Sequence, residues 1–249
     1  MSDSRIPKII HYCWFGGKEK PAEVEYCIAS WRKFLPDYEI MEWNEGNFSV
    51  EDSVPYVREA YSLGKWAFVS DYVRLYALKQ YGGFYFDTDV EVFQSFDELL
   101  RCPMVLGFES NDYLTTAVIG CEPETPLIAE FLDDYQNRHF ILPDGTPDME
   151  TTNVVKLTRM MVSHGLELNG KLQRVGDAVV FPQWYFSAND LINIVGKYRK
   201  DGYAYHHMNA SWYDKKLSRN FLMRVRRYVL GVARNTVGTQ TLYNLRHRK

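Results

Sequence analysis

The sequence predicts an α/β fold with a mainly parallel sheet flanked by helices, and three observations lead to it. A chain of 249 residues that is 46% hydrophobic can bury one large core without dividing into several domains. Short apolar runs alternate along it with longer segments whose apolar residues recur at helical spacing. No internal repeat or low-complexity linker interrupts this order. Alternating strands and helices form a mainly parallel sheet, to which some antiparallel strands are expected to be added.

The expected strands are short apolar runs bounded by glycine, proline or polar residues. The first, residues 8–15, ends at the pair Gly16-Gly17 and should leave the sheet through a glycine turn. The others are residues 38–43, 84–86, 90–93, 104–108, 115–120 and 178–181.

Helical spacing of apolar residues predicts five helices. They cover residues 21–35, 57–81, 126–137, 153–164 and 217–232. The second can be divided into two pieces by Gly64, and Gly82-Gly83 follows it in the position typical of a helix C-terminus. Residues 139–152 are expected to form a polar loop.

Two aspartates, Asp87 and Asp89, follow directly after the expected strand 84–86. Residues two apart in extended chain point to the same side, so both carboxylates can bind one cation. Ligands of open α/β sheets bind at the carboxyl ends of strands, where this pair lies. Two hard oxygen ligands suit Mg²⁺ or Mn²⁺ together with the oxygens of a diphosphate. The alternative is that the pair only caps a turn, because a single match of this kind is weak evidence.

One acid and one base, Asp71 and Arg74, lie on the apolar face of the helix that precedes this strand. Burying an unpaired charge costs several kcal/mol in order of magnitude. We therefore expect the two to pair with each other, with the backbone or with a ligand. A purely structural ion pair is the alternative to a binding role.

Together these residues resemble the sugar-binding region of a known family. The residues that carry the resemblance are Ser70-Asp71-x-x-Arg74, Gly82-Gly83-x-Tyr85-x-Asp87-x-Asp89 and the run 6–17 with Trp14 before the glycine pair. They are similar to the Och1-like and capsular polysaccharide DXD glycosyltransferases and to the glucosyltransferase domains of the large clostridial toxins. The resemblance covers about residues 6–93, with a weaker match near 205–212. It implies a Rossmann-like GT-A fold and retention of the anomeric configuration.

The resemblance also implies a role for each matching residue. Trp14 would stack on the nucleobase, and Asp71 and Arg74 would hold the hydroxyls of the donor sugar. Asp87 would lie near the ribose and the metal, and Asp89 would bind the metal directly. The expected catalytic residues are Asp71, Arg74, Asp87 and Asp89, and the expected nucleotide-sugar site adds Tyr12, Trp14, Ser70 and Tyr85.

A later segment, His206-His207-Met208-Asn209-Ala210-Ser211-Trp212, resembles the ending of the bacterial members. One histidine could complete the metal sphere, which would favour Mn²⁺ over Mg²⁺. Adjacent side chains of an extended chain point in opposite directions, so only one histidine is expected to reach the metal. The spacing does not show which of the two it is. Ser211 and Trp212 would cover the diphosphate and donate to the leaving oxygen. The alternatives are a surface or core histidine pair and a packing role for Trp212.

Charge is divided unequally along the chain. Residues 215–249 hold 10 Lys and Arg and no Asp or Glu, whereas the preceding residues hold 19 basic and 32 acidic side chains. We expect a catalytic domain at residues 1–214 and a basic amphipathic helix and tail at 215–249 that meets an anionic membrane surface. The alternative is a terminal helix packed on its own domain. The acidic body argues against a nucleic-acid partner.

The four cysteines form no CxxC pair, and the sequence shows neither a signal peptide nor a membrane span. The expected location is therefore the cytoplasm, with the tail at the inner face of the membrane.

The leading hypothesis is a retaining hexosyltransferase that depends on Mn²⁺ or Mg²⁺ and uses a UDP-sugar. The expected acceptor is a glycan or a lipid-linked saccharide, as in polysaccharide biosynthesis. UDP is favoured because the sugar-binding residues resemble those of the clostridial toxin domains. Attack of the acceptor on the leaving-group face is preferred over a covalent intermediate. The alternatives are a GDP-sugar-dependent mannosyltransferase, a metal-dependent phosphohydrolase and a non-catalytic nucleotide-sugar-binding protein.

Overall fold

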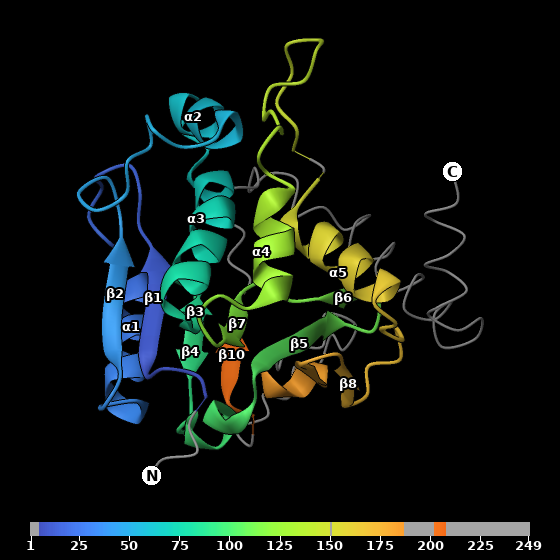
Figure 1. The fold of residues 1–249 in the computed structure, drawn as a ribbon. Coiled ribbons are helices and arrows are strands. Elements are labelled where there is room, and N and C mark those ends of the chain that lie inside the picture. The colour runs from blue at the N-terminus through green and yellow to red at the C-terminus, as the bar shows by residue number, and fades with distance from the viewer. Residues whose placement is uncertain (1–4, 150, 187–201, 208–249) are drawn as a thin grey trace, which may run out of the picture.

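The computed structural model describes residues 5–149, 151–186 and 202–207. Within them the α/β class is confirmed: one eight-stranded sheet carries helices on both faces, and a separate two-stranded ribbon lies beside it (Figure 1). The helix expected at 217–232 and the domain boundary expected after residue 214 lie outside the described residues. No helix in the described ranges combines the length and apolar character needed to cross a bilayer.

The sheet has the strand order β2-β1-β3-β7-β5-β9-β8, and β6 pairs with β5. Its strands are β1 (Ile9–Cys13), β2 (Glu39–Trp43), β3 (Gly83–Phe86), β5 (Met104–Ser110), β6 (Tyr113–Leu114), β7 (Val118–Cys121), β8 (Gln173–Val175) and β9 (Ala178–Phe181).

Five of these strands run in the same direction. β1 pairs in parallel with β2 and β3, β5 pairs in parallel with β9, and the antiparallel β7 lies between β3 and β5. The carboxyl ends of β1, β3 and β5 therefore open at the same edge of the sheet. The prediction of a mainly parallel sheet with antiparallel additions is confirmed, and this edge is where a ligand site is expected.

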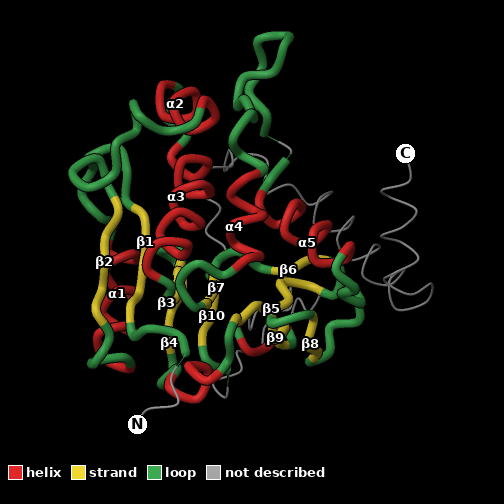
Figure 2. The backbone as a smooth tube through the Cα atoms, viewed as in Figure 1, coloured by secondary structure: helices red, strands yellow, loops and turns green. Residues whose placement is uncertain are grey.

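The helices are α1 (Ala22–Phe34), α2 (Pro55–Ser62), α3 (Trp66–Tyr81), α4 (Pro126–Asp133) and α5 (Asn153–Ser163). Figure 2 shows how they alternate with the strands and loops. The long helix expected at 57–81 is divided into α2 and α3, and Gly64 lies in the break with a φ of 64°. That left-handed conformation favours glycine, which explains why the division falls there.

Two hydrophobic clusters cover the two faces of the sheet. One contains apolar side chains of α2, α3, α4 and α5 with the sheet residues that alternate toward them, such as Tyr85 and Leu106. The other contains α1 residues, including Trp31, with Phe84 and Phe86 of β3 and with the ribbon formed by β4 (Val90–Val92) and β10 (Ala204–His206). The site residues described below reach the sheet edge from both layers.

A buried histidine joins β1 to the turn that begins β3. Trp43 Nε1 donates to His11 Nδ1 at 3.1 Å, and His11 Nε2 lies 2.8 Å from the carbonyl oxygen of Gly82. A carbonyl only accepts hydrogen bonds, so Nε2 carries the proton and the ring is neutral. Burial lowers the pKa of His11 to about 4, although the bond to Gly82 opposes this effect.

We predict that the protein loses stability between about pH 6.5 and pH 4 because His11 must stay neutral. Its pKa in the folded state is below that of the unfolded chain, so the unfolded chain binds more protons in this range. The stabilisation is therefore complete above pH 6.5 and falls as the pH falls toward 4, by an amount of the order of 3 kcal/mol. Urea unfolding at several pH values measures it.

The variants are compared by how steeply their free energy of unfolding falls with decreasing pH, and not by its value at one pH. His11→Gln should remove this part of the acid loss, whereas His164→Gln, which changes a surface histidine paired with Glu130, should leave it. Equal slopes for wild type and His11→Gln would contradict the prediction.

Candidate active site

Three strands deliver side chains to the same edge of the sheet. Trp14 follows the last residue of β1, Asp87 follows the last residue of β3, and Glu109 lies near the end of β5. Helix α3 packs against β1 and β3 and supplies Asp71 and Arg74 from its inner face. Of these side chains, Asp71, Arg74 and Asp87 are in direct contact, at the edge where parallel sheets bind ligands.

Arg74 lies at the centre of this group, and its side chain is only 5% exposed. Its Nη2 is 2.9 Å from Asp71 Oδ1 and 3.2 Å from Asp87 Oδ1. Its Nη1 donates to the carbonyl oxygen of Thr116 at 2.7 Å, and its Nε donates to that of Ser70 at 3.3 Å. One guanidinium thus fixes two carboxylates relative to the backbone, which its planar fork of donors allows.

Tyr85 contacts both the guanidinium of Arg74 and the carboxylate of Asp87. Its ring centroid is 4.6 Å from the guanidinium carbon of Arg74, and its hydroxyl donates to Asp87 Oδ1 at 3.0 Å. Burial raises the pKa of Asp71 to about 6, the charge of Asp87 adds to this, and Arg74 opposes it. Burial alone would lower the pKa of Arg74, but the negative charge around it outweighs burial and raises that pKa.

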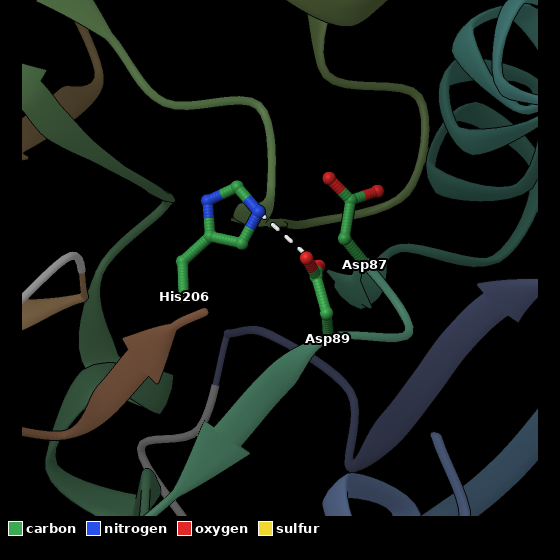
Figure 3. A group of neighbouring side chains, drawn as sticks. All are labelled: Asp87, Asp89 and His206. Carbon is green, nitrogen blue, oxygen red and sulfur yellow. Dashed lines mark ion pairs between the residues drawn. The ribbon is translucent and has the colours of Figure 1, made fainter. Parts of the chain in front are cut away.

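A candidate cation site lies next to this group. Asp87, Asp89 and His206 offer ligand atoms that all lie within 4.8 Å of one another (Figure 3). His206 Nε2 is 3.2 Å from Asp89 Oδ1. Burial lowers the pKa of His206, but the hydrogen bond to Asp89 and the nearby acids raise it by more. Two carboxylates and one imidazole form a donor set that fits Mn²⁺ well and Mg²⁺ less well.

The adjacent histidine takes a different partner. His207 Nε2 lies 3.0 Å from Glu91 Oε2, and the hydroxyl of Tyr26 donates to Glu91 Oε1 at 2.7 Å. The structure therefore brings His206, and not His207, to the two aspartates, as the opposite directions of adjacent side chains require.

The expected residues of the first strand occupy separate positions. Trp14 is partly buried, and its indole Nε1 donates to the carbonyl oxygen of Lys18 at 2.6 Å. Tyr12 is 5% exposed, and its hydroxyl donates to Glu42 on the side of the sheet that α1 covers. The structure does not bring Tyr12 to Arg74. Ser211 and Trp212 lie outside the described residues.

Sequence reasoning missed two side chains at this site. Asn153, at the start of α5, donates through Nδ2 to the carbonyl oxygen of Asp71 at 2.7 Å and accepts from the hydroxyl of Tyr135. No sequence signal marks it. Burial raises the pKa of Glu109, the charge of Asp87 adds to this, and His206 opposes it. An acid directly after an apolar strand is a signal that could have identified Glu109.

Comparison with known proteins places this geometry in context. Residues 21–105 match the family described as "Glycosyltransferase sugar-binding region containing DXD motif". The matched segment contains Asp71, Arg74, Asp87 and Asp89, and it ends well before His206.

Two curated proteins are similar to parts of the chain. "Glucan organizing enzyme 1" of Cryptococcus neoformans var. grubii is 33% identical over 84 residues, which are 30% of this chain and 23% of that protein. "Inositol phosphoceramide mannosyltransferase 3" of Schizosaccharomyces pombe is 28% identical over 128 residues, which are 50% of this chain and 36% of that protein. The chain thus spans about a quarter and about a third of the lengths of these relatives.

Among solved structures, the one titled "PaToxG Glycosyltransferase" aligns with a TM-score of 0.50 at 20% identity. The alignment covers 64% of this chain and 68% of that chain. It supports the likeness of fold, in agreement with the GT-A fold expected from the sequence.

We predict that Arg74→Met destabilises the protein by about 3–5 kcal/mol, because it leaves two partly buried carboxylates without the guanidinium that pairs with them. Arg74→Lys should lower the free energy of unfolding by less, since lysine keeps the positive charge but not the planar group that reaches Thr116 and both acids. Urea unfolding at neutral pH measures both losses.

The matched control is Arg5→Met, which breaks an exposed ion pair with Glu122 and should change the stability little. A loss for Arg74→Met that is no larger than the loss for Arg5→Met would contradict the central role of this cation.

Proposed function

We propose that the protein transfers a hexose from a nucleotide-sugar donor to a glycan acceptor, and the match of residues 21–105 to the sugar-binding region of DXD-containing glycosyltransferases supports this. The observation that carries the proposal is the position of the cluster Asp87, Asp89 and His206 directly beside the Asp71–Arg74 pair. One subsite can hold a diphosphate through a cation, and the other offers charged hydrogen-bonding groups for sugar hydroxyls.

Asp87, Asp89 and His206 would hold Mn²⁺ or Mg²⁺ in this proposal. The cation supplies charge neutralisation for the departing nucleotide diphosphate. Arg74 keeps Asp87 in place through Oδ1, and Tyr85 donates to the same oxygen. The protein therefore orients this carboxylate before the donor binds, and preorganised charge of this kind contributes most to stabilising a transition state.

The donor sugar would lie against Asp71 and Arg74, and the nucleobase would stack on Trp14. Trp14 is partly exposed just after β1, which leaves part of its indole ring accessible. Stacking tolerates any base, so UDP is proposed from the resemblance to the toxin-type sugar-binding block alone. The names of the two curated relatives refer to a glucan and to mannosyl transfer, and both support a hexose. A GDP-sugar-dependent mannosyltransferase is the alternative.

We propose retention of configuration by attack on the leaving-group face. The bond between the anomeric carbon and the diphosphate oxygen breaks, and the acceptor oxygen bonds to that carbon on the same face. The acceptor's proton moves to the departing phosphate oxygen. A two-metal phosphohydrolase is less well supported, because the described residues contain one cluster with metal-ligand geometry.

The acceptor is proposed to be a glycan or a lipid-linked saccharide. Residues 139–149 form a loop that rises beyond α4 (Figure 1), and Glu59 of α2 holds it by accepting the backbone N–H groups of Phe140 and Ile141 at 2.7 and 2.9 Å. This loop leads to Asn153, which contacts Asp71, so it is a candidate wall for the acceptor. Membrane contact through residues 215–249 stays a prediction, because they lie outside the described residues.

We predict that the protein slowly hydrolyses one member of a panel of UDP- and GDP-sugars in the presence of Mn²⁺. Asp89→Asn should lower this rate by roughly 100-fold or more, because losing a metal ligand removes several kcal/mol of charge stabilisation. A chelator should abolish hydrolysis and added Mn²⁺ should restore it, as followed by release of the nucleoside diphosphate.

The control is Asp37→Asn, which changes an aspartate whose side chain is 78% exposed, and it should keep the wild-type rate. If no donor is bound or cleaved, or if Asp89→Asn matches wild type, the glycosyltransferase proposal is wrong.

A further inference from the structure

One nitrogen of His206 is left without a hydrogen bond. Nε2 faces Asp89 at 3.2 Å, whereas Nδ1 is buried and has no hydrogen-bond partner among the described residues. A buried polar atom without a partner is costly. A histidine that binds a metal through one nitrogen almost always donates its other N–H to a carboxylate, a carbonyl or a water. When Nε2 binds a cation, Nδ1 carries the proton and needs an acceptor.

Strand β5 has an irregularity where it approaches this region. Phe108 pairs with Leu114 and Ser110 pairs with Tyr113, so Glu109 is an extra residue on β5 that opposes no residue on β6. This is a β-bulge, and such bulges redirect side chains next to functional sites.

The alternation of side chains along β5 shows on which face of the sheet Glu109 lies. Val105 packs in the cluster that includes β4 and β10, and Gly107 lies against Phe186 of the same cluster. Successive side chains of a strand alternate between faces, so Glu109 belongs to the face of Val105 and Gly107. That face is covered by the ribbon whose ends carry Asp89 and His206.

The charges agree with this placement. Glu109 is partly buried, and its carboxyl group interacts electrostatically with two groups, His206 and Asp87. No described residue donates a hydrogen bond to it. A carboxyl group without a described donor therefore lies on the face of the sheet that the ribbon covers, and this ribbon carries a buried imidazole nitrogen without a partner.

We propose that Glu109 is a positioning residue for the cation site, which accepts the hydrogen bond of His206 Nδ1–H, directly or through one water, when Nε2 binds the cation. This inference rests on the proposed function, because it concerns the same cation site. The bond fixes the tautomer with the proton on Nδ1 and leaves the Nε2 lone pair for the metal. It also stops rotation of the imidazole ring.

The test compares Glu109→Met with Glu109→Gln, which are similar in size and equally uncharged. Only glutamine keeps an acceptor oxygen, so the difference between the two isolates the hydrogen bond. We expect Glu109→Met to weaken Mn²⁺ binding, measured by calorimetry, by about 10–100-fold, as loss of outer-shell partners does in other metal sites. Glu109→Gln should bind at least about fivefold more tightly than Glu109→Met.

A second comparison shows whether the effect acts through His206. In a His206→Gln background, the same Glu109→Met change should alter the Mn²⁺ dissociation constant by less than about threefold. The hydrogen bond to the imidazole is already absent there, so the effects of the two substitutions are not additive. Glu130→Gln breaks a surface carboxylate–histidine pair with His164 and should leave Mn²⁺ binding unchanged. Thermal unfolding in the absence of Mn²⁺ shows that each variant is folded.

The outcomes separate this inference from the proposed function. If wild type binds no Mn²⁺, the cation site and the role of Glu109 both fail. If wild type binds Mn²⁺ but Glu109→Met binds it equally well, only the role of Glu109 fails. Equal losses in Glu109→Met and Glu109→Gln, or an undiminished loss in the His206→Gln background, would also overturn it.

Discussion

The arrangement of the site depends on one buried cation. Arg74 contacts Asp71, Asp87 and the carbonyl oxygen of Thr116, so it joins α3 to the end of β3 and to the segment before β7. Without it, the two carboxylates would repel each other in a region of low dielectric. Its position on the inner face of α3 determines where Asp71 lies relative to Asp87, and Asp87 then links this pair to the candidate cation site.

The parts of the fold that local sequence determines could be predicted. Apolar runs ending in glycine or acid located β1 and β3, and helical spacing placed Asp71 and Arg74 on one inner face. The ends of parallel strands share an edge, so the placement of Trp14 and Asp87 after two strand ends at that edge followed from the expected topology. The Gly64 break could also be expected, because few other residues adopt its backbone conformation.

The rest depends on pairing between distant segments, which local patterns do not report. β6, β8 and β10 have only two or three residues, too few to show a period. The choice of His206 over His207 is made by the pairing of β10 with β4, and a bulge against β6 leaves Glu109 without an opposite residue. Asn153 and Asp71 are 82 positions apart in the sequence, so no local sequence pattern indicates their contact.

The distance along the chain between the parts of the cation site has a consequence for biosynthesis. β10 returns to pair with β4, and the neighbouring contact between Glu91 and His207 spans 116 positions. On the ribosome the two aspartates emerge and can fold into the sheet edge well before the histidine exists, since folding proceeds from the amino terminus as the chain is made. A nascent chain at this stage therefore holds only two of the three residues of the proposed cation site. The proposed cation site is complete only after β10 has docked on β4.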